Sequence, residues 1–153
     1  MDAYFPILQQ LSRANIQFAI IGTFALKHHF PEKMATYTLG DCDLIIQPSL
    51  PNIKSAISVL RENDWKVSLW EHEVNSNLEW TLLEGKFYLR ATQNELQLDL
   101  TYECPWIPWV EMERGINRVG YLPIAAIKHV KRLKQIKGSP KDLKTLDRLS
   151  KEN

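Results

Sequence analysis

Apolar residues recur in two different periods along the first half of the chain. Helical spacing predicts helices, whereas short apolar runs rich in strand-forming residues predict strands. The predicted elements are a helix over residues 4–14, a strand over 17–21, a helix over 24–30, a loop over 32–40, a strand over 44–47 and a helix that follows Ser49. Pro31 ends the second helix, and Ser49 is suited to cap the third.

The second half of the chain is predicted to hold further strands and then two helices. The elements are strands over residues 65–70 and 78–83, a hairpin turn at Glu84-Gly85, a strand over 86–90, a turn over 92–94, a strand over 95–102, an irregular segment over 104–109, and helices over 123–137 and 140–150. Gly138 is expected to close the first of these helices and Ser139 to cap the second. Helices and strands are therefore mixed along the chain.

The composition is typical of one globular domain. The chain has 153 residues, of which 44% are hydrophobic and 24% charged, which is enough for a single core. We expect one domain over residues 1–153, with a core over about 1–113 and a helical C-terminal part over about 120–150. No apolar run reaches membrane-spanning length, and the start lacks the basic and apolar regions of a signal peptide. A cytoplasmic protein with no membrane partner is expected.

The two cysteines, Cys42 and Cys104, have no metal-binding spacing and are expected to be free thiols.

The net charge of +1 hides a strong asymmetry between the two parts of the chain. Residues 114–153 carry eleven Lys or Arg and three acids, whereas residues 1–113 carry eight Lys or Arg and fifteen acids. An acidic part able to hold a metal ion is thus followed by a basic part able to hold phosphate or nucleic acid. A solvated basic face on the last helices explains the second feature equally well.

Two aspartates flank a single residue where the second apolar strand begins. In an extended strand the side chains alternate between faces, so Asp41 and Asp43 point to one side and Cys42 to the other. The Asp-x-Asp spacing is not specific by itself, because Glu71-His72-Glu73 and Glu111-Met112-Glu113 share it. Only Asp41 and Asp43 lead directly into an apolar strand.

A third aspartate lies within the most regular strand pattern of the chain. Alternation over residues 95–102 directs the leucines to a core and Asp99 to the other face. Neighbouring strands bring same-face carboxylates within about 5 Å of one another. Three clustered carboxylates repel unless a cation lies between them, and oxygen ligands that leave room for water and phosphate favour Mg²⁺. The chemistry implied is phosphoryl or nucleotidyl transfer.

One lysine of the first C-terminal helix falls on its apolar face. Lys134 follows Val130 by four residues, so helical geometry directs it inward, while Lys128 and Lys131 point away. An inward lysine is unusual. Two interpretations stay open: a side chain that extends its ammonium to water, or a phosphate contact at a cleft.

Together these motifs resemble the DNA polymerase beta-like nucleotidyltransferase superfamily. That pattern is an apolar strand, a Gly followed by Gly or Ser, a helix, an Asp-x-Asp on the next strand and a later acid. The residues that carry the resemblance are Ile20-Ile21-Gly22-Thr23, Asp41-Cys42-Asp43 and Asp99. The small bacterial branch of lincosamide and aminoglycoside nucleotidyltransferases and abortive-infection toxins is similar in size and has a C-terminal Lys and Lys-Asp helix start, as in Lys134 and Lys141-Asp142. The resemblance covers about residues 16–147.

This resemblance implies an α+β nucleotidyltransferase fold, with a mixed, mostly antiparallel sheet, helices packed on one face and a helical C-terminus. It implies one or two Mg²⁺ ions bound by Asp41, Asp43 and Asp99, which are also the implied catalytic residues, and nucleotide phosphates bound by Gly22, Thr23 and Lys134. The substrate would be a nucleoside triphosphate such as ATP. The sequence departs from the family in Thr23, where Gly or Ser is usual, and in lacking an Arg-x-Thr before Asp41.

Three functions follow as alternatives. The first is an Mg²⁺-dependent enzyme that moves a nucleoside monophosphate to a hydroxyl of a small molecule, a protein or RNA, as in antibiotic resistance or a toxin. The second is an inactive module of the same fold, an antitoxin or regulator that binds a partner chain or a second copy. The third is a nucleic-acid-binding domain that uses the basic residues Lys128, Lys131, Arg132, Lys137, Lys141 and Lys144.

Overall fold

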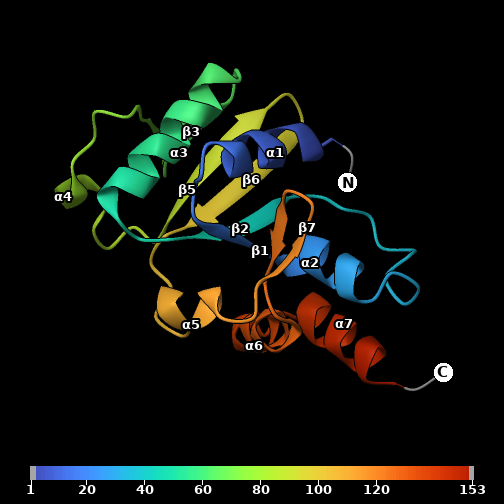
Figure 1. Ribbon diagram of the computed structural model, residues 1–153. Helices are drawn as coiled ribbons and strands as arrows, with labels where there is room; N and C mark the ends of the chain where they lie inside the picture. Colours follow the sequence, from blue (N-terminus) through green and yellow to red (C-terminus); the bar gives the residue numbers. More distant parts are fainter. Residues whose placement is uncertain (1–2, 152–153) are drawn as a thin grey trace.

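A mixed eight-stranded sheet forms the centre of the computed structural model, which describes residues 3–151 (Figure 1). The strands are β1 (Phe18–Ile21), β2 (Cys42–Ile46), β3 (Lys66–Leu69), β4 (His72–Glu73), β5 (Tyr88–Gln93), β6 (Leu96–Thr101), β7 (Asn117–Val119) and β8 (Leu122–Ile124). The helices are α1 (Phe5–Arg13), α2 (Gly22–His29), α3 (Leu50–Glu62), α4 (Trp80–Leu83), α5 (Trp109–Glu113), α6 (Ile127–Lys137) and α7 (Pro140–Ser150). The expected single domain extends beyond this range by residues 1–2 and 152–153, which lie outside the described residues.

The sheet is open, and its strand order is β4-β3-β5-β6-β2-β1-β8-β7. Five neighbouring pairs are antiparallel, and two, β2 with β6 and β1 with β8, are parallel. The predicted α+β class and the predicted mixed, mostly antiparallel sheet are therefore confirmed for the described part of the chain.

The core lies against one face of the sheet. Alternation along β2 and β6 sends Leu44, Leu98 and Leu100 to this face, where each is at most 1% exposed. The amphipathic helices α1 and α3 cover it with their apolar sides (Figure 1). Helix α6 instead lines a cavity on the other face, so the predicted packing of helices on one face is wrong for α6.

The predicted helix caps are present in the structure. Ser49 accepts a hydrogen bond from the Asn52 amide at the start of α3, and Ser139 accepts one from the Asp142 amide at the start of α7. Gly138 closes α6 in the left-handed conformation, as the sequence predicts. Each cap satisfies backbone groups that a helix end leaves without a partner.

An ion pair joins the last two helices. The Nζ atom of Lys134 lies 3.0 Å from Oδ1 of Asp142, and their side chains are only 12% and 7% exposed. Burial opposes ionisation of Asp142, but hydrogen bonds from Ser139 and Lys134 prevail and lower the pKa of its carboxyl. The pair is therefore charged at neutral pH and holds α7 against α6.

Two predicted elements are wrong. Residues 78–83 form no strand and end in the short helix α4, because Leu78 and Leu83 are both buried and a strand would direct residues five apart to opposite faces. Glu84-Gly85 accordingly joins no hairpin, and β5 pairs instead with β3 and β6.

The first C-terminal helix begins at Ile127 rather than residue 123. Residues 122–124 form β8, in which Ile124 aligns with Ile20 of β1, and the Ala125 amide donates to the Ile20 carbonyl. Residues 122–124 thus form a strand, although helix was predicted there, because β1 offers them an edge with which to pair. The short elements β4, α5 and β7 were not predicted.

None of the helices within residues 3–151 has the length and apolar character needed to cross a membrane.

Replacing Lys134 by alanine tests the link between the last helices. Lys134→Ala leaves the buried Asp142 carboxylate without its cation, which should lower the free energy of unfolding by about 1.5–3 kcal/mol. Urea unfolding at neutral pH measures the change. The control, Lys128→Ala, alters an exposed lysine of the same helix and should stay within about 0.5 kcal/mol of the wild type. Equal effects in both variants would contradict a structural ion pair.

Candidate active site

The pairing of β2 with β6 brings two aspartates together. In this parallel pair Asp43 aligns with Asp99, and in the antiparallel pair with β1 it aligns with Ile21. Residues aligned on neighbouring strands direct their side chains to the same face, with Cβ atoms about 5 Å apart. The predicted juxtaposition of Asp43 and Asp99 is therefore present in the structure.

Gly22 lies against this pair at the junction of β1 and α2. Its φ is +68°, and a Cβ built on it would lie 2.7 Å from Oδ2 of Asp43. The position thus requires glycine for two reasons: the left-handed backbone and the close approach of a carboxylate. Thr23, the next residue, is not among the described residues that line the cavity at this site.

Asp41 lies just before β2 rather than within it, and is exposed. Gln97 of β6 connects it to Asp99, because its Nε2 donates to Oδ2 of Asp41 at 2.9 Å and to Oδ2 of Asp99 at 3.4 Å. Asp41 is thus joined to Asp99 by hydrogen bonds through Gln97, and Asp43 is placed beside Asp99 by the strand register.

Arg90 of β5 holds the third aspartate. Its Nε donates to Oδ1 of Asp99 at 2.9 Å and its Nη2 to Oδ2 at 3.3 Å, a bidentate arrangement. Sequence reasoning missed this residue, although the turn at residues 94–95 contained the signal. A two-residue turn that pairs Gln93 with Leu96 also aligns Arg90 with Asp99.

The carboxyl of Asp43 is in an environment that disfavours its charge. Burial raises its pKa most, and the nearby charges of Asp99 and Asp41 raise it further, while Lys137 and Lys134 act in the opposite direction. The net shift is upward. Any additional cation near Asp43 would therefore stabilise the ionised carboxylate.

These groups open into a cavity of about 470 Å³ on the face of the sheet away from the main core. Its floor is β2, β5 and β6, and α6 forms the opposite wall. The lining residues that carry charge or aromatic rings are Asp43, Asp99, Arg90, Lys134, Lys137, Tyr88 and Trp106. Anionic and cationic groups thus face each other across a space large enough for a small ligand.

Lys134 lines this cavity, as predicted, but its ammonium is already paired with Asp142. Lys137, one helical turn later, also lines it and acts more strongly on the pKa of Asp43. The sequence analysis counted Lys137 only among the basic residues that could bind nucleic acid. Its spacing contained the signal, because Lys137 follows Val130 by seven residues and Leu133 by four and so lies on the same face of α6 as Lys134.

The carboxylates of the cavity are few, which limits the metal ions that they could hold. Within residues 3–151 no group of three or more His, Cys, Asp or Glu side chains is arranged to hold a metal ion. However, Mg²⁺ commonly takes one or two carboxylates, with water and substrate phosphate completing its shell. Asp43 and Asp99, side by side on β2 and β6, fit that requirement.

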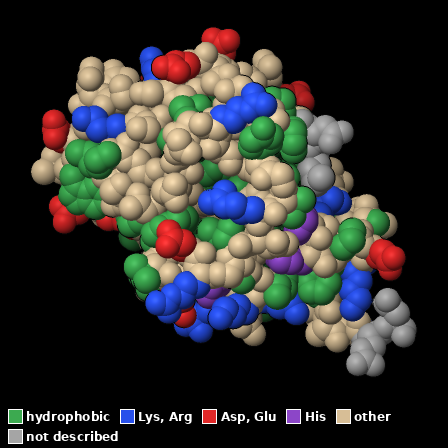
Figure 2. Space-filling model, viewed as in Figure 1, with side chains coloured by type: hydrophobic (Ala, Val, Ile, Leu, Met, Phe, Trp, Pro, Cys, Tyr) green, Lys and Arg blue, Asp and Glu red, His purple; other side chains and the backbone are tan. Residues whose placement is uncertain are grey.

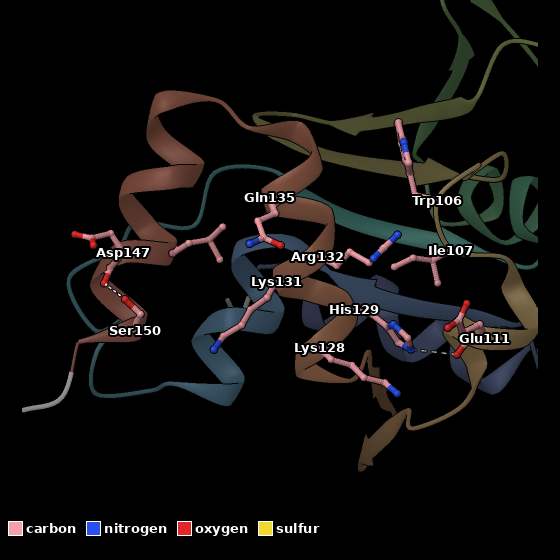
Figure 3. Close-up of a pocket in the computed structure, with 11 residues that line it drawn as sticks. Trp106, Ile107, Glu111, Lys128, His129, Lys131, Arg132, Gln135, Asp147 and Ser150 are labelled. Atoms are coloured by element: carbon pink, nitrogen blue, oxygen red, sulfur yellow. Dashed lines mark hydrogen bonds between the residues drawn. The ribbon is translucent and has the colours of Figure 1, made fainter.

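A larger cavity of about 800 Å³ lies between α5, α6 and α7 (Figure 3). Lys128, Lys131 and Arg132 project from α6 along it, and the His129 ring bonds to the Glu111 carbonyl at 3.1 Å. Its two acids, Glu111 and Asp147, come from different elements and do not form a pair. The smaller cavity, where carboxylates, a glycine junction and lysines converge, is therefore the better candidate for chemistry.

Comparison of the sequence with protein-family models and with curated proteins finds no match.

Replacing Gly22 by alanine tests the contact with Asp43. Gly22→Ala and Gly120→Ala both place a Cβ on a residue with positive φ, so both should lower the free energy of unfolding by about 1–2 kcal/mol. Only Gly22→Ala should displace the Asp43 carboxylate, because nothing lies within 4 Å of the Cβ position at Gly120. Carboxyl NMR signals report the displacement. An unmoved Asp43 signal in Gly22→Ala would refute the contact.

Replacing Asp43 by asparagine should stabilise the protein at neutral pH. The folded state raises the pKa of Asp43 above its ordinary value of 3.8, so the native protein binds the proton more tightly than the unfolded chain. Stability contributed by this group is full below pH 3.8 and is lost as pH rises through the folded pKa. Thermal melts at pH values from below 3.8 to neutral should show that the melting temperature of Asp43→Asn increases relative to that of the wild type as pH rises. The exposed control Glu71→Gln should show no such trend.

Proposed function

We propose that this chain is an Mg²⁺-dependent nucleotidyltransferase that moves a nucleoside monophosphate from a nucleoside triphosphate to a hydroxyl of an acceptor. The observation that carries the proposal is the alignment of Asp43 with Asp99 on adjacent strands, beside Gly22 and opposite the lysines of α6. The order of these parts along the chain matches the superfamily pattern that the sequence resembles. The acceptor would be a small molecule, a protein or RNA.

Each carboxylate has a role in this proposal. Asp43 and Asp99 would hold Mg²⁺, with Asp41 at the exposed side as a further ligand. Bound Mg²⁺ would lower the pKa of the acceptor hydroxyl and neutralise charge on the phosphates. Asp99, which receives two hydrogen bonds from Arg90, would keep its carboxylate oriented toward the acceptor.

The cationic and amide groups would bind the triphosphate. Gly22 begins α2, so backbone N–H groups at this junction could donate to phosphate oxygens. Lys137 and Lys134 line the opposite wall. The acceptor hydroxyl would give up its proton to water, and its oxygen would bond to the α-phosphorus as the bond from the α-phosphorus to the oxygen bridging it to the β-phosphate breaks. Pyrophosphate would leave with a negative charge that these lysines help to compensate.

One observation favours the inactive module as a second candidate. Arg90 occupies both oxygens of Asp99, and this ion pair already neutralises one of the three carboxylates. A protein that uses the cavity only to bind a nucleotide or a partner chain needs no free third carboxylate. The experiment below separates the two functions.

The transfer assay combines the purified chain with Mg²⁺ and radiolabelled nucleoside triphosphates in the presence of aminoglycosides, lincosamides, total tRNA or total protein. Label should appear on one acceptor class. Asp43→Asn and Asp99→Asn should each reduce transfer on the order of 100-fold or more, since groups that hold or orient a metal commonly cost 10–100-fold. Glu71→Gln, from the exposed Glu-x-Glu, should transfer at the wild-type rate.

Protection of a cysteine from alkylation can show nucleotide binding separately from transfer activity. Cys104 lines the cavity, whereas Cys42 is buried and its thiol pKa is raised by that burial, so only Cys104 should react with an alkylating reagent. Protection of Cys104 by Mg²⁺ and nucleotide without any transfer would support the inactive module. The absence of both protection and transfer would refute the enzyme and the inactive module alike.

A further inference from the structure

A second polar pocket of about 470 Å³ lies between α7 and the loop that precedes Asp41. We call it the hydroxyl–cation pocket. Its lining residues are Thr36, Tyr37, Thr38, Lys141, Lys144, Thr145 and Arg148. All seven side chains can donate a hydrogen bond, and none is acidic. This composition differs from the cavity in Figure 3, where Glu111 and Asp147 accompany the basic residues.

The three cations of this pocket lie on one face of α7. Lys141, Lys144 and Arg148 are spaced three and four residues apart, so they are neighbours on the helix surface and repel one another. Within residues 3–151 none of them forms an ion pair with an acid. The two acids of α7 are engaged elsewhere, Asp142 with Lys134 and Asp147 with Lys151. Arg148 also lines a neighbouring pocket that contains Glu32, but no ion pair joins the two, so these three cations have no paired acid among the described residues.

The loop that forms the opposite wall is held in place by two lysines. Lys27 of α2 donates to the carbonyls of Met34 at 2.9 Å and Tyr37 at 2.6 Å. Lys33 donates to the carbonyls of Leu149 and Lys151, at 3.2 and 2.7 Å, and so ties the loop to the end of α7. The pocket is thus preformed rather than created by two mobile segments.

Side chains inside the pocket are also ordered by contacts. The Arg148 guanidinium lies 5.4 Å from the centre of the Tyr37 ring, which limits its conformations. Thr145 is only 3% exposed, and its hydroxyl donates to the Lys141 carbonyl at 2.9 Å. The exposed hydroxyls of Thr36 and Thr38 remain at the rim. Donors from two elements therefore converge on one space.

We infer that the hydroxyl–cation pocket binds phosphate groups, carried either by a nucleic-acid backbone or by a free polyphosphate. Arg and Lys charges with Thr and Tyr hydroxyls are the side chains that contact phosphate oxygens in nucleic-acid complexes. A phosphate between α7 and the loop would remove the repulsion among the three cations. This site is separate from the aspartate cavity, with which it shares no lining residue, and it does not depend on transferase activity.

The test measures binding of two probes, a fluorescein-labelled single-stranded RNA by anisotropy and inorganic tripolyphosphate by calorimetry, as salt is raised. The triple variant Lys141→Gln/Lys144→Gln/Arg148→Gln removes three phosphate contacts. It should lose affinity for RNA by on the order of 10- to 100-fold, and the slope of log K against log salt should shrink by about 2. The matched control is Lys128→Gln/Lys131→Gln/Arg132→Gln on α6, which changes the same charge at another cavity and should lose several-fold less affinity.

A second variant distinguishes binding in a defined pocket from general attraction to a basic surface. Thr36→Val/Thr38→Val leaves every charge in place and should still lower affinity about three- to tenfold. Glu71→Gln, which changes an exposed acid outside both cavities, should bind both probes as the wild type does, whatever the outcome of the transfer assay. RNA binding with weak competition by tripolyphosphate identifies the backbone as the source, and tight tripolyphosphate binding alone identifies the free compound. Binding of neither probe, equal losses in the two triple variants, or no effect of the Thr changes would overturn the inference.

Discussion

The parallel pairing of β2 with β6 is the constraint on which the candidate site depends. On one face this register buries Leu44 beside Leu100 in the main core, and on the other it sets Asp43 beside Asp99. A slip by one residue would send the carboxylates into the core and the leucines to the cavity, so core burial fixes the register. Hydrophobic burial thereby holds together two carboxylates that repel each other. The pKa of Asp43 is raised first by its own burial and second by the charge of Asp99.

The remaining parts of the cavity are responses to this concentrated negative charge. Gly22 lets the start of α2 approach Asp43 closely, Arg90 pairs with Asp99, and Lys137 faces them from α6. These three residues belong to different elements: Gly22 to the junction of β1 and α2, Arg90 to the neighbouring strand β5, and Lys137 to the end of α6. Arg90 pairs with Asp99 and not with Asp43, which is why Asp43 is the residue most informative about function.

Local sequence patterns predicted much of this arrangement. The features that they did not predict depend on contacts between residues far apart in the sequence. Alternation alone directed Asp43 and Asp99 away from the core, and the Gly22 turn and the helix caps follow from short-range chemistry. The pairing of Arg90 with Asp99 could also have been predicted, because the two-residue turn between β5 and β6 sets which residues align. The partner of Lys134 was not, because Asp142 belongs to another helix, and β8 formed where helix was expected because β1 offered it an edge.

The basic C-terminal part shows why net charge could not predict function by itself. Figure 2 shows Lys and Arg gathered most densely at the lower edge of the molecule, over α6. Folding divides this charge among three places: Lys134 and Lys137 face the aspartates, Lys128, Lys131 and Arg132 follow the larger cavity, and the cations of α7 enclose the hydroxyl–cation pocket. The first group faces the aspartates, and the second lies beside Glu111 and Asp147. The α7 group faces hydroxyls, which donate hydrogen bonds but add no negative charge, and so its compensation has to come from a ligand or from solvent ions.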